Sequence, residues 1–272
     1  MDLRNLADTY EQTQRVRIQA ENRVRAVFQG SDEEVAEHVA NDRTIKRLRY
    51  AEEDVKLQME DELKNHPCYV WAMGVPGLNR TLAAKIFGLI GDVERFARFS
   101  NLRTFSGHTP GKNRLVKGEK SCFNRRLKTC CYLFFESSIK VASIKLKFPP
   151  EKKYADIYRN WRSVYLQRYG AGDIKKKENS LDKDGNRYTF PDEVAKEWPD
   201  IRQHYAAKNK LVDVFLFHVY EEWLEKIGSD KKATLYSHEV LGHHMKFERS
   251  DFSNPKMSEQ KRKQHKSDAA AT

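Results

Sequence analysis

Hydrophobic positions in the first 65 residues follow the spacing of two amphipathic helices. Over residues 1–28 they recur every three or four positions, close to a heptad, although two polar residues interrupt the stripe. Gly30 breaks the pattern, and Ser31 with Glu34 has the spacing of a capping box that starts a second helix. Two helices joined by a short turn predict an antiparallel coiled-coil hairpin, or arm, over residues 1–65.

The rest of the chain also shows helical spacing, without a run of alternating strand type. Short helical patterns fill residues 66–150. A polar stretch at 171–191 predicts an exposed loop, and a long amphipathic helix after it stops at Gly228. The polar, basic residues 251–272 predict a disordered tail. The fold class is therefore mainly α, with the arm, a compact body over 66–150, a helical extension over 151–250 and the tail.

One helix after residue 150 carries an aromatic stripe with two possible uses. Such a stripe packs into a core, or it stacks with unpaired bases, because both uses need the same side chains. The stripe consists of Tyr154, Tyr158, Trp161, Tyr165 and Tyr169.

A Pro-Gly turn separates two apolar segments of the body. Pro76 and Gly77 precede a helical pattern that starts near Asn79. Glycine permits a tight turn and a close approach of phosphate to the backbone, and the free N–H groups of a helix start favour an anion. The pattern suits a helix-hairpin-helix, with Arg80 adding a side-chain contact. Many helix pairs use such a turn for packing alone.

Charge adds a candidate interface to this picture. The 272-residue chain is 39% hydrophobic, enough for a core, and its net charge of +11 indicates a polyanionic partner, with acidic proteins or anionic lipid as alternatives. Between Arg95 and Lys128, ten lysines and arginines stand against one acid, Glu119, a net charge of +9. This concentration predicts a phosphate-contacting face, although a merely solvated basic face has the same composition. The arginines of the arm are likewise either a solvated surface or a backbone-tracking one. The candidate nucleic-acid-binding residues are Pro76, Gly77, Asn79, Arg80, Arg103, His108, Lys112, Asn113, Arg114, Lys117, Lys120, Asn124, Arg125, Arg126 and Lys128.

Other functional classes find little support. No window has the length and apolar character of a membrane span, and the charged start lacks a signal-peptide core, so we expect a cytoplasmic protein. The four cysteines match neither a zinc site nor a disulfide framework, which predicts reduced thiols. His238 and His243 are five residues apart, whereas a zincin needs four. We expect no metal, no cofactor and no catalytic residue.

Residues 75–129 carry a family resemblance, and they read VPGLNRTLAAKIFGLIGDVERFARFSNLRTFSGHTPGKNRLVKGEKSCFNRRLKT. This stretch resembles the C-terminal helix-hairpin-helix domain of the bridge-RNA-guided DEDD transposases, the Transposase 20 family. Because a predicted coiled-coil arm precedes it in the sequence, the stretch is also similar to the Nop domain of box C/D small nucleolar ribonucleoproteins and to the Tas proteins of RNA-guided systems. The matching parts are the Pro-Gly turn, residues 90–96, residues 102–107, and Gly118 with residues 124–127.

The resemblance implies a protein that binds a structured guide RNA and, with it, target DNA, as a homodimer through the arm. The chain departs from the transposases in two ways. Its early carboxylates lie on the predicted arm, so we expect no RuvC-like nuclease domain, and the loop after Pro110 lacks the family's serine nucleophile. Recognition without cleavage is therefore expected. The alternative is a truncated or split transposase relative that binds DNA, with a nuclease in trans, and a third possibility is an architectural DNA-binding protein.

Overall fold

The computed structural model describes residues 2–28, 30–109, 118, 120–169, 200–231, 233 and 247–270. In these residues every regular element is helical, with ten α-helices, three short 3-10 helices and no strand. The prediction of a mainly α chain is confirmed at this level. The α-helices are α1 (Leu3–Val27), α2 (Asp32–Asn41), α3 (Arg43–Glu62), α4 (Tyr69–Met73), α5 (Arg80–Ile90), α6 (Phe99–Phe105), α7 (Arg125–Ala142), α8 (Tyr154–Tyr169), α9 (Asp200–Lys226) and α11 (Pro255–Ala270). The 3-10 helices are η1 (Leu63–Asn65), η2 (Val93–Arg95) and η4 (Arg249–Phe252).

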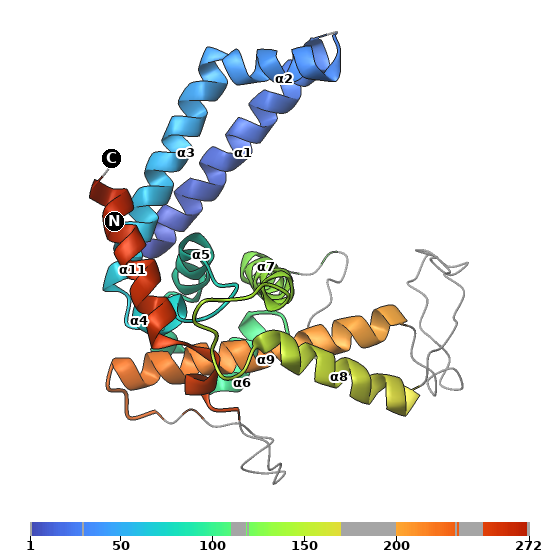
Figure 1. The fold of residues 1–272 in the computed structure, drawn as a ribbon, viewed down its shortest axis with the longest axis vertical. Coiled ribbons are helices and arrows are strands. Elements are labelled where there is room, and N and C mark those ends of the chain that lie inside the picture. The colour runs from blue at the N-terminus through green and yellow to red at the C-terminus, as the bar shows by residue number, and fades with distance from the viewer. Residues whose placement is uncertain are drawn as a thin grey trace.

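The arm contains three helices where the sequence predicts two. Helices α1 and α3 lie side by side and run in opposite directions, and α2 crosses their far end (Figure 1). The predicted capping box is confirmed, because Ser31 and Glu34 exchange hydrogen bonds at the start of α2. The extra boundary lies at Asp42, whose side chain accepts a hydrogen bond from the backbone N–H of Ile45 and so starts α3.

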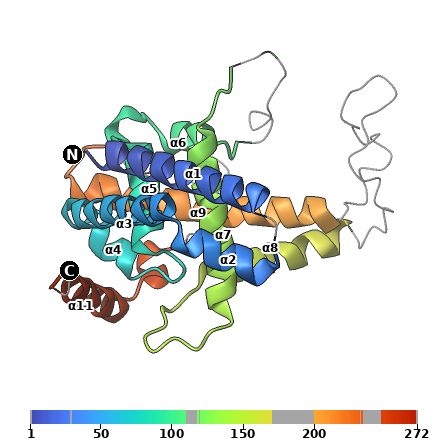
Figure 2. The same ribbon diagram turned by 90° about the horizontal axis from the view of Figure 1, so that it is seen from above.

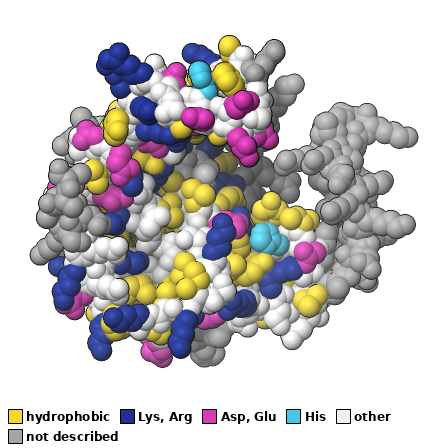
Figure 3. All heavy atoms as spheres, turned by 45° about the horizontal axis from the view of Figure 1, so that its top comes forward, with side chains coloured by type: hydrophobic (Ala, Val, Ile, Leu, Met, Phe, Trp, Pro, Cys, Tyr) yellow, Lys and Arg dark blue, Asp and Glu magenta, His cyan; other side chains and the backbone are white. Residues whose placement is uncertain are grey.

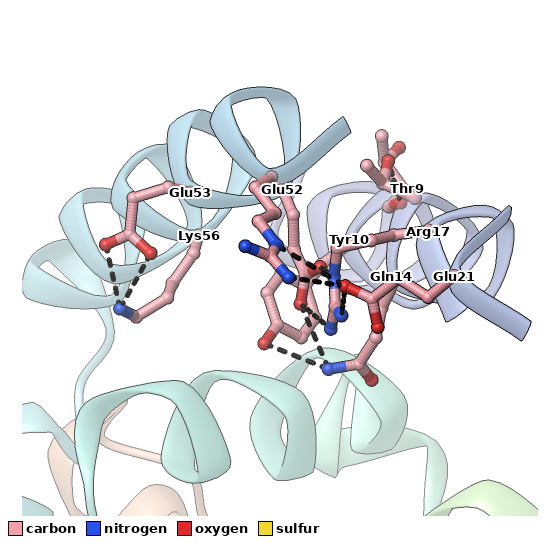
Figure 4. A network of polar contacts seen from close by, with 10 residues as sticks. Thr9, Tyr10, Gln14, Arg17, Glu21, Glu52, Glu53 and Lys56 are labelled. Atoms are coloured by element: carbon pink, nitrogen blue, oxygen red, sulfur yellow. Dashed lines mark hydrogen bonds and ion pairs between the residues drawn. The ribbon is translucent and has the colours of Figure 1, made fainter. Parts of the chain in front are cut away.

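A network of ion pairs and hydrogen bonds connects α1 and α3 (Figure 4). Arg17 of α1 binds Glu52 of α3 and Glu21 one turn along its own helix. Arg49 of α3 reaches back to Glu21 at 3.0 Å. These pairs explain why a charged residue interrupts the apolar stripe of α1, since it faces a carboxylate on the neighbouring helix. A charged position of this kind favours one register of two helices over others.

One continuous core joins the base of the arm to the body. It runs from Leu6 in α1 to Phe252 in η4, and it includes seven of the eleven residues of α5. Seen from above, α1 and α3 lie over α5, with α9 beneath (Figure 2). Helix α5 is thus packed on several sides, which requires its nearly uninterrupted apolar sequence.

The aromatic stripe of α8 faces α9, as expected for a core stripe. Tyr154 is 2% exposed, and its hydroxyl lies 2.7 Å from Nδ1 of buried His218. Tyr165 is also buried, while Tyr158 and Trp161 pack against the core. Stacking with unpaired bases would require exposed rings, so the core interpretation applies to these four residues. Helix α9 ends before Gly228, at φ +67°, as the sequence predicts.

The prediction of a disordered tail is wrong for the described part of residues 251–272. Phe252 and Met257 are buried, and helix α11 packs against α4. Ser258 donates a hydrogen bond to the carbonyl of Val70, and Ser253 donates one to that of Trp71. The segment looks featureless in sequence because much of its docking uses backbone carbonyls as partners, which leave no pattern in the side chains.

Candidate nucleic-acid interface

The Pro-Gly turn connects α4 to α5 and packs tightly against α7. Gly77 has φ +83°, and a Cβ there would lie 2.8 Å from the backbone of Ser138. Pro76 is buried, and the side chain of Asn79 caps α5 by accepting a hydrogen bond from Leu82 N–H. The glycine is therefore required for packing, on the side where a Cβ would point.

Side chains of other elements occupy the surroundings of this turn. Lys261 of α11 donates hydrogen bonds to the carbonyls of Val75 and Leu78, at 3.3 and 3.2 Å. Burial lowers the pKa of Lys261 to about 8, and nearby Arg80 adds to this shift. Arg80 itself lies 3.4 Å from a carboxylate oxygen of Glu60. Helix α11 thus brings one cation, Lys261, to the turn, which the prediction of a disordered tail does not place there.

Two predicted contact residues in and just after α6, Arg103 and His108, have structural partners. Arg103 of α6 binds Asp213 of α9 through two hydrogen bonds of 2.8 and 2.6 Å. His108 is 1% exposed and lies 3.0 Å from the hydroxyl of Ser106. Burial, followed by the positive charges of Lys128 and neighbouring cations, lowers the pKa of His108 to about 3. A buried, neutral ring offers no surface for an external strand.

Among the cations at the start of α7, some contact other side chains and one is exposed without an ion partner. The side chain of Asn124 caps the helix, and Arg126 pairs with Asp8 and Glu11 of α1, which fixes the base of the arm to the body. Lys128 lies 4.7 Å from the centre of the Phe123 ring, a cation–π contact. Arg125 is exposed and has no ion partner among the described residues.

Part of the predicted interface lies outside the described residues, namely Lys112, Asn113, Arg114 and Lys117. His238 and His243, whose spacing argues against a zincin, also lie outside them. Lys120 is described and exposed. The four cysteines are free, as predicted, and burial raises the pKa of the Cys130 thiol to about 11.

Charge is distributed unevenly between the arm and the body. Residues 66–150 contain fifteen basic and four acidic side chains, a net charge of +11, which equals the net charge of the whole chain. Residues 1–65 contain eleven basic and fifteen acidic side chains, a net charge of −4. A net negative arm is a poor track for phosphates along its length, so its arginines away from the body fit a solvated or ion-paired surface better.

A cleft lies where the arm meets the body, and sequence reasoning missed it. Its volume is about 430 Å³, and Arg15 of α1, Lys85 of α5 and Arg126 of α7 contribute positive charge to its lining. Lys85 falls outside the basic segment, and Arg15 lies within the acidic arm, so neither stood out in the sequence. Only the packing of α1 and α7 against α5 brings the three together.

Other kinds of site find no support in the described residues. No group of three or more His, Cys, Asp or Glu side chains is placed to hold a metal ion there. Among the helices of the described ranges, none combines the length and the apolar character needed to cross a bilayer. Comparison with protein-family models, curated proteins and solved structures gave no match.

Proposed function

We propose that the protein binds a structured guide RNA and, together with this RNA, recognises target DNA without a nuclease of its own. The choice of RNA rests on the resemblance of residues 75–129 to the Nop-like domain of bridge-RNA-guided transposases. In this interpretation α4, the Pro-Gly turn and α5 correspond to the helix-hairpin-helix, and α1 to α3 correspond to the coiled-coil arm. Base pairing supplies the sequence specificity, and the protein holds the backbone of the RNA.

The observation that carries the proposal is the concentration of positive charge on the body. Apolar side chains fill the core there, and one basic stretch, at Arg95–Lys128, has ten cations and a single acid. Five exposed cations of the body have neither an ion partner nor a cation–π contact among the described residues and are free to contact phosphates, namely Arg98, Lys120, Arg125, Lys140 and Lys145. Phosphate contacts of this kind supply most of the affinity for a nucleic acid.

A pair of charge-reversal variants tests this assignment. We would change Lys120 and Arg125 to glutamate in one protein, and Arg43 and Arg47 of the arm in the other. All four side chains are exposed and lack an ion partner in the described ranges, so the variants match in charge change and in exposure. Binding to a labelled stem-loop RNA and to a DNA duplex of equal length is measured between about 50 and 200 mM salt.

The body variant should lose about tenfold or more in RNA affinity, with a salt dependence about 1.4 units shallower, because two phosphate contacts disappear. The arm variant should bind nearly as the wild type does. Equal losses in both variants would show a non-specific charge effect. Tighter binding of the duplex than of the RNA would favour a DNA-binding transposase relative instead.

A further inference from the structure

The cleft between the arm and the body has two walls and a floor from three different helices. Helices α1 and α7 both pack on α5, and they leave about 430 Å³ between them. This volume lies within the range of about 300–1,000 Å³ that is usual for small-molecule sites. Figure 3 shows hydrophobic side chains in and beside the hollowed middle of the face below the arm. The residues that matter here are Glu11, Arg15, Ile18, Lys85, Arg126 and Leu133.

The cations of the cleft are held in place but not fully neutralised. The ammonium group of Lys85 lies 4.0 Å from Glu11 and 4.4 Å from the ring centre of Tyr10. The Nε of Arg126 donates a hydrogen bond of 2.8 Å to Glu11, while its buried Nη2 has no hydrogen-bond partner among the described residues. Arg15 is exposed and likewise lacks an ion partner there. The three cations face Glu11 in the lining and Asp8 just outside it, which also pairs with Arg126, so the site keeps a net charge of +1.

The apolar part of the lining is unusually open to solvent. Ile18 of α1 is 43% exposed and Leu133 of α7 is 51% exposed, and both line the same cleft from opposite sides. A phosphate or sulfate ion would bind the cations and leave Ile18 and Leu133 exposed to solvent. A ligand that covers both parts joins an anionic group to a largely apolar one, and a nucleotide, with its phosphate and its base, has this composition. Enzymes that extrude a base hold it in a comparable way, between apolar or aromatic side chains.

We propose that this cleft binds one unpaired nucleotide of the RNA, with the base between Ile18 and Leu133 and the phosphate at Arg15, Lys85 and Arg126. The proposal rests on the proposed function, since it assumes an RNA on the body. At this cleft, the arm and the body would contact the same RNA strand. Because Arg126 also pairs with Asp8 and Glu11, the bound phosphate lies beside the contact that fixes the arm.

The first test uses methyl NMR of the full chain, with adenosine 5′-monophosphate as the probe. The nucleotide should shift the methyl signals of Ile18 and Leu133. Adenosine alone and inorganic phosphate, at the same concentration, should shift them much less, because each satisfies only half of the site. Equal shifts with phosphate would reduce the cleft to a simple anion site and overturn the proposal.

The second test measures binding of the stem-loop RNA by two matched pairs of variants. Arg15→Gln is compared with Arg25→Gln, and Leu133→Gln with Val16→Gln. The control residues are exposed on α1 and do not line the cleft. Both cleft variants should weaken RNA binding about fivefold, and the controls should not. The loss from Arg15→Gln should shrink as salt rises, whereas the loss from Leu133→Gln should persist, because apolar contacts are not screened.

The two tests separate the cleft from the proposed function. If the wild type binds the RNA and the cleft variants bind it equally well, the cleft proposal fails and the proposed function stands. If the wild type binds the free nucleotide in the cleft but does not bind RNA, the proposed function fails, and with it the assignment of the cleft to an RNA strand.

Discussion

Replacing Arg103 by methionine should destabilise the protein by about 3 kcal/mol at pH 7.5 and by much less at pH 5. Arg103 holds Asp213 through two hydrogen bonds, from Nε to Oδ1 at 2.8 Å and from Nη2 to Oδ2 at 2.6 Å. Burial raises the pKa of Asp213 to about 6, against the opposing effect of Arg103, which lowers it. The variant keeps an apolar stem in place but removes the only cation bonded to this carboxylate in the described structure.

The magnitude follows from burial, and the pH dependence follows from the pKa. Removing one partner of a buried ion pair costs about 3–5 kcal/mol, and the lower end applies because both side chains are only partly buried, with Arg103 31% and Asp213 16% exposed. At pH 7.5 the folded wild type carries the ionised carboxylate, which the variant must leave unpaired or protonate. At pH 5, below the folded pKa of about 6, the carboxyl is already mostly protonated, so less is lost. Because the folded pKa exceeds the unfolded one, the contribution of Asp213 to stability falls as pH rises from about 4 to 6.

Urea unfolding, followed by tryptophan fluorescence at both pH values, provides the measurement. With a slope of about 3 kcal/mol per molar urea, the predicted loss at pH 7.5 moves the midpoint down by about 1 M. Arg125→Met is the matched control, since Arg125 is exposed at the start of α7 and should leave the midpoint unchanged. An equal loss at pH 5 and pH 7.5, or a loss no larger than that of the control, would refute the reasoning.

Three further predictions follow from the described contacts. Gly77→Ala should lower the melting temperature more than Gly118→Ala does, because both glycines have positive φ but only at Gly77 would a Cβ meet the backbone of Ser138. Because burial lowers the pKa of Lys261 to about 8, the folded state releases that proton first; wild-type stability should therefore rise relative to Lys261→Met as pH increases from about 8 to 10, as measured by thermal unfolding. Tyr50 is 76% exposed on the arm; if the homodimer that the family resemblance implies uses this face, Tyr50→Lys should reduce the mass measured by light scattering to that of a monomer, and an unchanged dimer would exclude this face.

Local signals in the sequence predict many helix ends correctly. The capping box at Ser31, the start of α5 after Asn79 and the stop at Gly228 are all found where residue type and spacing place them. Each depends on groups within a few residues, so a single sequence is sufficient. The break at Asp42 follows the same rule of N-capping, but the continuous helical spacing around it conceals the boundary.

The partners of the charged residues could not be predicted, because they are distant along the chain. Arg103 meets Asp213 110 residues later, and Lys261 reaches the carbonyl of Leu78 183 residues earlier. A count of cations finds the basic segment but does not separate paired side chains such as Arg126 from exposed ones such as Arg125. The cleft was missed for the same reason, since its lining comes from helices that only the fold brings together.

The nucleic acid that accompanies the protein tests the central claim most directly. The protein would be purified at moderate salt from cells that carry its native genomic neighbourhood, and the bound nucleic acid would be extracted and sequenced. Guide-dependent recognition predicts one discrete, structured short RNA bound to the wild type. The Lys120→Glu/Arg125→Glu variant, purified in the same way, should retain much less of it. Heterogeneous fragments or none, together with tight, salt-sensitive binding of bare DNA duplex, would contradict it.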